Sequence, residues 1–215
     1  MQVEYRVGTQ ALTDGAQVPP TLGHQGQSQT DDTHARYYNI AFRTALGENS
    51  SFVASTGVAG VAPGTVLSTT PPFALWNPPG SGRNLYIIRV TLGYVSGTLG
   101  AGSLWYAFVN GQNTAPTTGT ALTSNSSVIG SVGSATGKAY QGSTVGATPS
   151  PLRPSALNWG AFLATTAAVN PPQSEEIAGN ILVVPGGVFV VQAVAAAGTT
   201  PLVAIGVEWG EERAA

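Results

Sequence analysis

The chain has 215 residues, of which 42% are hydrophobic but only 8% are charged, with a formal net charge of -2 and no cysteine. The missing cysteines exclude disulfides, thiolate zinc sites and cysteine nucleophiles. The lack of any Lys/Arg cluster excludes a nucleic-acid binder, which needs a basic stripe. A surface built from small uncharged residues is easily desolvated, so the composition favours broad contact with neighbouring subunits over an extracellular module with a Thr/Ser-rich exterior.

The first 33 residues are polar and contain Pro19-Pro20 and Asp31-Asp32, with a single strand-like stretch at Val3–Val7. They predict an extended N-terminal arm, residues 1–33, that becomes ordered on its partners, or otherwise a frayed tail. Residues 34–215 are predicted to form one domain. The chain starts without the basic segment and apolar run of a signal peptide. No apolar run approaches the roughly 20 residues needed to span a bilayer, so we expect a soluble protein made in a cytoplasm, without a membrane partner.

Strand signals begin in the first half of the domain, at Ala35–Arg43, Phe52–Ala54, Val58–Leu67 and Phe73–Trp76. The clearest strand is Leu85–Val95, in which Tyr86, Ile88, Val90, Leu92 and Tyr94 alternate with their neighbours in the period-two pattern of a strand. After the glycine-rich turn Ser96–Gly102, Leu104–Val109 is predicted to return as the hairpin partner of that strand.

The second half continues with short, weak strands over residues 111–157 and a stronger one over Trp159–Val169. The last third is the most regular, with strands predicted at Ile181–Val184, Val188–Ala195 and Val203–Trp209. No segment has convincing helical periodicity. Eight to ten strands separated by turn signals predict an all-β protein, a single antiparallel β-sandwich with a jelly roll as the preferred form.

Carboxylates are too sparse for acid/base chemistry of the usual kind. No Asp or Glu lies between Glu48 and Glu175, and a glycosidase needs two carboxylates flanking its scissile bond. The only internal pair, Glu175-Glu176, is interpreted as a solvated loop, because adjacent residues on a strand would point to opposite faces.

The two histidines, His24 and His34, lie in or beside the polar arm, and no Gly-x-Ser-x-Gly motif accompanies them, as a serine hydrolase would require. Asp32 and His34 could place two metal ligands on one strand face. A metal site needs more ligands, which a symmetry axis could supply, but a solvated turn is favoured. We therefore expect a protein that is not an enzyme, with no catalytic, cofactor-binding or metal residues.

A phosphate-loop-like string and a set of aromatic residues are two further candidates for binding sites. Residues 133–139 look like a phosphate loop, but the two glycines are four apart instead of five, and Ala139 stands where Ser or Thr is required. The four tryptophans, with seven tyrosines, could form a sugar-stacking platform. Core packing is favoured because large aromatic side chains are usually buried; the tryptophans are Trp76, Trp105, Trp159 and Trp209.

Three stretches, Leu75–Leu85, Leu92–Gly102 and Pro201–Glu212, together with the charge-poor, Gly/Ala/Thr/Ser-rich composition, resemble virion structural proteins of tailed bacteriophages. The resemblance implies a jelly-roll-type domain, trimeric, without catalytic residues. It implies a capsid decoration or cement protein that stabilises the shell by binding at capsomer junctions. Its partners would be the major capsid protein or other virion proteins, and its location the virion. The alternative is a tail or fibre receptor-binding or carbohydrate-binding β-sandwich module.

Overall fold

The computed structural model describes residues 50–130, 133–157, 173–196 and 198–214. A division of the chain falls between Tyr38 and Asn39, and all described residues belong to the unit Asn39–Ala215. The predicted arm, residues 1–33, and the predicted strands Ala35–Arg43 and Trp159–Val169 lie outside the described residues. Within the described ranges, no helix is long and apolar enough to cross a membrane.

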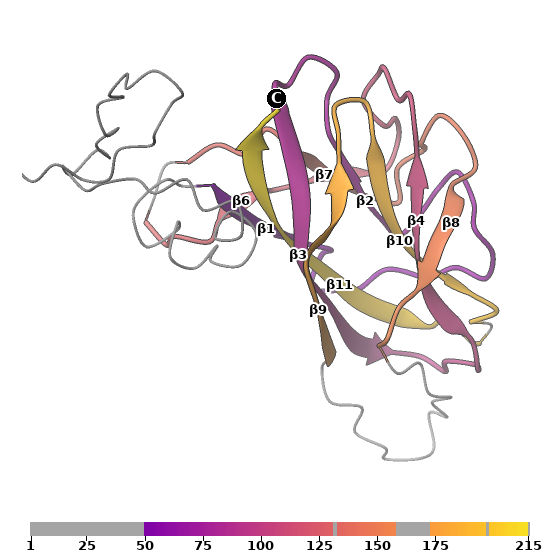
Figure 1. Cartoon of the computed structure of the whole chain (residues 1–215). Helices are drawn as coiled ribbons and strands as arrows, with labels where there is room; N and C mark the ends of the chain where they lie inside the picture. The colour runs from indigo at the N-terminus through magenta and orange to yellow at the C-terminus, as the bar shows by residue number, and fades with distance from the viewer. Residues whose placement is uncertain (1–49, 131–132, 158–172, 197, 215) are drawn as a thin grey trace, which may run out of the picture. The chain divides into compact units, whose positions relative to one another are not determined.

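The described residues form two antiparallel sheets that confirm the predicted all-β sandwich (Figure 1). One sheet has five strands in the order β6-β1-β11-β3-β9, and the other has six in the order β5-β7-β2-β10-β4-β8. The strands are β1 (Ser51–Ser55), β2 (Phe73–Trp76), β3 (Arg83–Ser96), β4 (Ser103–Val109), β5 (Thr120–Leu122), β6 (Asn125–Ser126), β7 (Lys138–Gln141), β8 (Ser150–Pro154), β9 (Gln173–Val183), β10 (Val188–Val194) and β11 (Leu202–Arg213).

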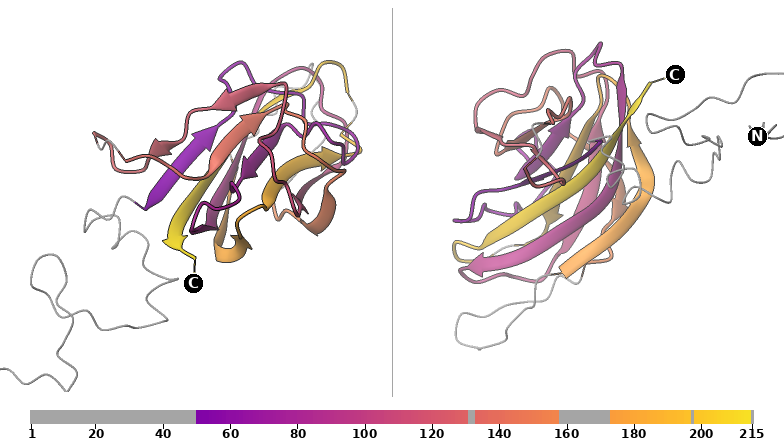
Figure 2. Two further views of the ribbon diagram at one scale, coloured as in Figure 1. Left: turned by 90° about the horizontal axis from the view of Figure 1, so that it is seen from above. Right: turned by 90° about the vertical axis from the view of Figure 1, so that its left-hand side faces the viewer.

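The pairing of the eight main strands defines a jelly roll. The first four strands pair in turn with the last four in reverse order, as β1 with β11, β2 with β10, β3 with β9, and β4 with β8. Successive main strands alternate between the two sheets, apart from β4 and β8, so the paired chain wraps around one core. The right-hand view of Figure 2 shows β11, β3 and β9 side by side, with β9 at the margin of its sheet.

The predicted hairpin between Leu85–Val95 and Leu104–Val109 is wrong. Strand β3 pairs with β11 and β9, whereas β4 lies in the other sheet and pairs with β10 and β8. Ser96–Gly102 therefore crosses from one sheet to the other instead of closing a hairpin. The predicted strand Val58–Leu67 is also wrong, because the structure has only an isolated bridge there, between Val61 and Val203.

A bulge in β3 shifts the face that the sequence pattern assigned to the core. Leu85 and Ile87 belong to the central cluster, and so do Val90 and Leu92, so the inward phase changes between residues 87 and 90. The register with both neighbouring strands shifts at this point. An extra residue in one strand moves later side chains to the opposite face, and Ile88 is that residue.

The main core lies between the sheets, and its largest fully buried side chains include Trp209, Tyr106 and Phe189. A second, smaller cluster contains Trp76, Val188 and Val190 together with loop residues. Along β10, these residues alternate with core residues, so the six-stranded sheet is apolar on both faces. Burial of both faces explains why Val188–Val194 has an uninterrupted apolar pattern apart from Gln192.

Candidate functional site

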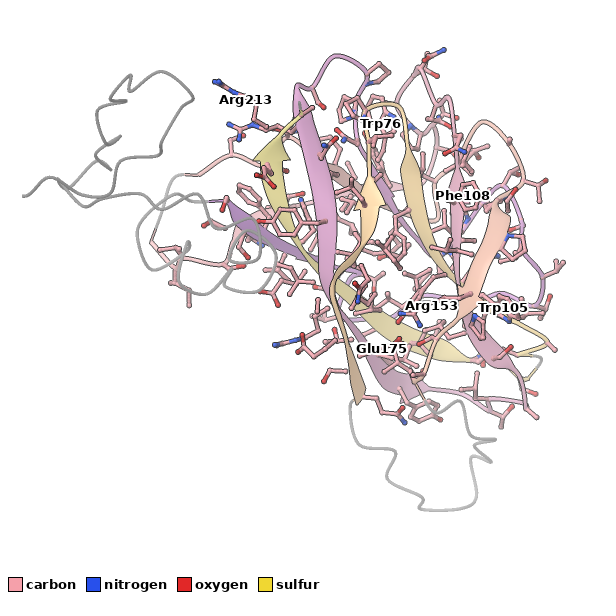
Figure 3. The ribbon with its side chains drawn as sticks, in the orientation of Figure 1. Trp76, Trp105, Phe108, Arg153, Glu175 and Arg213 are labelled. Atoms are coloured by element: carbon pink, nitrogen blue, oxygen red, sulfur yellow. The ribbon has the colours of Figure 1, made fainter. Side chains whose placement is uncertain are left out.

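The Glu175 carboxylate is the centre of a polar network and faces the interior between β9, β8 and β4. Its oxygens accept hydrogen bonds from Ser155 Oγ at 2.6 Å, Tyr106 Oη at 2.7 Å, Ala156 N at 2.8 Å and Arg153 Nη1 at 2.8 Å. Figure 3 shows Arg153 and Glu175 close together. Because β9 belongs to one sheet and β4 and β8 to the other, this network joins the two halves of the sandwich.

The electrostatics of the network fix the protonation of its members. Burial alone would raise the pKa of Glu175, but the hydrogen bonds from Ser155, Tyr106, Arg153 and Ala156 outweigh it and leave the pKa below its ordinary value. Burial raises the pKa of the Tyr106 phenol well above its ordinary value. Glu175 is therefore an ionised acceptor and Tyr106 a neutral donor. The Arg153 guanidinium also lies 5.0 Å from the centre of the Tyr106 ring, within cation–π range.

The interpretation of Glu175-Glu176 as a solvated loop is wrong. Both residues lie in β9 and point to opposite faces, so the Glu175 side chain is 10% exposed and that of Glu176 is 56% exposed. Glu176 pairs with Arg89 on the outer face of the sheet, in register across β3 and β9. The sequence held one signal for the inward face, since Glu175 is two residues from buried Ile177 and shares its side of the strand.

A second buried carboxylate, Glu211, is held by the string that looks like a phosphate loop. Thr136 N donates to both carboxylate oxygens, at 2.9 and 3.0 Å, and Gly137 N donates to Oε1 at 2.8 Å. Trp209 Nε1 donates to the same oxygen at 3.1 Å. A Cβ at position 137 would lie 2.8 Å from Leu85 Cδ1, so any larger residue there would force the Leu85 side chain to shift. The backbone donors that would hold a phosphate are bound to a carboxylate of the same chain.

The remaining candidate residues from the sequence are the tryptophans, the histidines and Asp32. Trp76 is 8% exposed and Trp209 is fully buried, which confirms the core-packing prediction for these two. The same prediction is wrong for Trp105, which is partly exposed and belongs to neither apolar cluster; its Nε1 donates to Ser103 Oγ at 2.7 Å. Trp159, His24, His34 and Asp32 lie outside the described residues. Among the residues that the structure describes, no group of three or more His, Asp or Glu side chains could hold a metal ion.

A shallow groove of about 410 Å³ lies beside β10 and is lined mainly by residues from the segment 61–72. Its wall includes Gln192, whose side-chain amide holds that segment by donating to Val66 O at 2.8 Å and accepting from Ser68 N at 3.1 Å. The lining residues are all uncharged and include the threonines Thr65 and Thr70. The groove therefore contains no side-chain charge that could pair with a charged ligand.

No protein-family model matches the chain, and no curated protein or solved structure matches it. Its function is therefore inferred from its own residues and their geometry.

Proposed function

We propose that this chain is a non-enzymatic structural protein of a tailed-bacteriophage virion, a decoration subunit that binds at capsomer junctions and stabilises the shell. The observation that carries the proposal is a jelly-roll pairing of strands in a chain with only 8% charged residues. Jelly rolls are a common architecture of viral capsid domains. Fold alone does not define function, so the composition of the surface is the second support.

The surface carries fewer charges than the composition alone indicates, because two of the carboxylates lie inside the fold. Glu211 is buried against backbone donors, and Glu175 is bound within the network between the sheets. These carboxylates stabilise the fold instead of facing solvent. Among the described residues, the exposed ones are mainly small and uncharged, and such side chains lose little hydration when a neighbouring subunit covers them.

Such a subunit would stabilise the shell through the number of bound copies more than through the affinity of any single site. Many copies on one lattice add through effective concentration, and binding to the assembled shell but not to free capsid protein stabilises the shell by mass action. The partners are the major capsid protein and further copies of this chain, with a trimer as the expected oligomer. The arm, residues 1–33, would add main-chain hydrogen bonds by pairing with a neighbour.

The test uses capsids of the encoding phage prepared without this protein. Purified full-length chain is mixed with them, and bound copies are measured by co-sedimentation, with the temperature of capsid disruption as a second readout. The proposal expects saturable binding and a higher disruption temperature. Binding to free capsid protein as strong as to capsids, or no binding to capsids, would contradict it.

A carbohydrate-binding module of a tail or fibre is the second candidate, because lectin domains also use jelly rolls. With Trp76 and Trp209 buried, a sugar-stacking role among the described tryptophans depends on the partly exposed Trp105. Tryptophan fluorescence during titration with neutral oligosaccharides tests this candidate. Saturable quenching that Trp105→Ala abolishes would support it, and quenching that persists in that variant would not.

A further inference from the structure

Arg83 and Arg213 are exposed cations whose guanidinium groups have no hydrogen-bond or ion-pair partner in the described part of the chain. The other described cations are all engaged, Arg89 and Arg153 by glutamates and Lys138 by a backbone carbonyl. Only 8% of the residues of this chain are charged. Two cations that the fold itself does not use are therefore candidates for a contact with another molecule.

The two arginines lie directly opposite each other at one end of the five-stranded sheet. Arg83 is the first residue of β3 and Arg213 the last of β11, and the register of the two strands pairs them. Figure 3 shows Arg213 at this end of the sheet. Residues directly opposite each other share one face of a sheet, with Cβ atoms about 4.5–5.5 Å apart. The two guanidinium groups therefore extend from neighbouring points on the same face.

The backbone holds this arginine pair in a fixed position. The pairing of the two strands continues past it, because Ala214 N donates a hydrogen bond to Gly82 O at 2.9 Å. Two residues further into the sheet, on the same face, Leu85 and Glu211 are in register and buried. The backbone at both arginines is thus part of the ordered sheet, and their side chains extend from it into solvent.

This arrangement of cations destabilises the isolated chain, because like charges directly opposite each other on neighbouring strands repel. Neither nearby carboxylate of the described residues forms an ion pair with the two arginines. Glu211 is bound by the backbone donors of Thr136 and Gly137, and Glu212 points to the opposite face of the strand from Arg213. A local feature that costs stability is expected at places that serve function.

We propose that Arg83 and Arg213 are a binding site for carboxylate side chains of the shell protein to which this subunit attaches. A guanidinium presents its N–H donors as a planar fork that matches a carboxylate, so two adjacent guanidinium groups can bind two carboxylates or share one. Carboxylates at this position would also remove the repulsion between the two cations. The inference rests on the proposed binding to the capsid and specifies the chemistry of that contact.

The charges of the described residues favour a different protein over a second copy of this chain. Every glutamate that the structure describes already interacts with another group of its own chain. A second copy could offer one of these carboxylates to the arginine pair only by giving up that interaction. An acidic patch on another protein can bind without breaking any of them. The glutamates concerned are Glu175, Glu176, Glu208, Glu211 and Glu212.

The test measures the affinity of the full-length chain for capsids prepared without it, at low and at high salt. Arg83→Gln and Arg213→Gln are combined in one variant, which removes both charges and keeps long polar side chains. Arg89→Gln is the matched control, because Arg89 is also an exposed cation of β3 but is paired with Glu176. Circular dichroism checks that each variant is folded.

At low salt, the double variant is expected to bind capsids about 10–100-fold more weakly than the wild type, whereas Arg89→Gln should bind as the wild type does. Salt screens exposed charges, so the affinity of the wild type should fall with salt and that of the double variant should fall much less. Equal affinity and equal salt dependence of wild type and double variant would overturn the site and leave capsid binding intact. A wild type that does not bind capsids would overturn both proposals.

A second measurement requires no capsid and identifies the chemistry of the ligand. A fluorescently labelled oligoglutamate peptide is titrated with each protein at low salt, with an oligoglutamine peptide as the uncharged control. The wild type is expected to bind only the oligoglutamate, and the double variant neither peptide. Replacing both arginines by lysine keeps the charges but removes the forks, so it should restore binding only in part. Oligoglutamate that binds the wild type and the double variant equally, or a DNA oligonucleotide that binds the wild type more tightly, would contradict a carboxylate site.

Discussion

Replacing Glu175 by glutamine removes the charge at the centre of the network between the sheets while keeping the size of the side chain. The carboxylate accepts hydrogen bonds from Ser155, Tyr106, Ala156 and Arg153. A hydrogen bond to a charged group contributes about 1.5–3 kcal/mol, and bonds within one network do not add fully, so we expect a loss of about 3 kcal/mol. For a domain of this size, that corresponds to a Tm lower by about 6–12 °C.

The neighbouring residue supplies the control, because Glu176→Gln makes the same chemical change on the exposed face of the same strand. Its pair with Arg89 involves two side chains that are about half exposed, and such surface pairs contribute at most about 1 kcal/mol. Urea denaturation at neutral pH measures both variants. Equal losses of unfolding free energy for the two variants would refute the assignment of Glu175 as the group that holds the sheets together.

The pH dependence of the unfolding free energies of the wild type and Glu175→Gln provides an independent check. The pKa of Glu175 in the folded protein lies below its ordinary value of 4.5, so the unfolded state binds protons more readily as the pH falls. The stabilisation is present above pH 4.5 and is lost as the pH falls through the folded pKa. The difference in unfolding free energy between wild type and Glu175→Gln should therefore shrink in acid. A difference that stays constant would contradict this account.

Two further substitutions test close contacts in the same way. In Gly210→Ala, the new Cβ would lie 2.2 Å from the buried ring of Tyr86, so we expect the unfolding free energy to fall by about 3 kcal/mol. Gly93→Ala is the control, because its Cβ would meet only ordinary contacts. It should change the unfolding free energy by less than about 0.5 kcal/mol. Comparable losses in urea would contradict this. Glu211→Gln replaces the carboxylate that holds the loop at Thr136 and Gly137 by an uncharged amide. We expect the unfolding free energy to fall by about 2 kcal/mol. It should also alter the emission of Trp209, which donates to Glu211; unchanged stability and emission would show that the loop needs no such anchor.

The sequence was sufficient to predict the fold class and the positions of the more regular strands. Phe73–Trp76 forms β2 as predicted, and the alternation from Val203 to Trp209 lies within β11. The predicted burial of Trp76 and Trp209 is likewise confirmed. These features depend on side-chain polarity repeated every second residue, which a strand imposes on its own sequence without reference to its partners.

Features that depend on distant parts of the chain were predicted wrongly or not at all. Glu175 was interpreted as part of a solvated loop, and no local pattern identified its hydrogen-bond donors Tyr106, Ser155 and Arg153, because they come from other strands and connections. The phosphate-loop-like string gave no indication that Glu211, more than seventy residues later, would occupy its donors. Buried polar groups need partners, but the sequence does not identify which ones.

The sequence by itself determined that this chain is a charge-poor, cysteine-free β protein with alternating strands and turn-forming breaks between them. Only the tertiary structure decided that Leu85–Val95 and Leu104–Val109 belong to different sheets, that the strands pair as a jelly roll, and that β9 is paired only with β3 among the described strands. The physical reason is that period-two polarity specifies which face of a strand is buried, whereas the choice of neighbour depends on packing and hydrogen bonds between residues far apart in the chain.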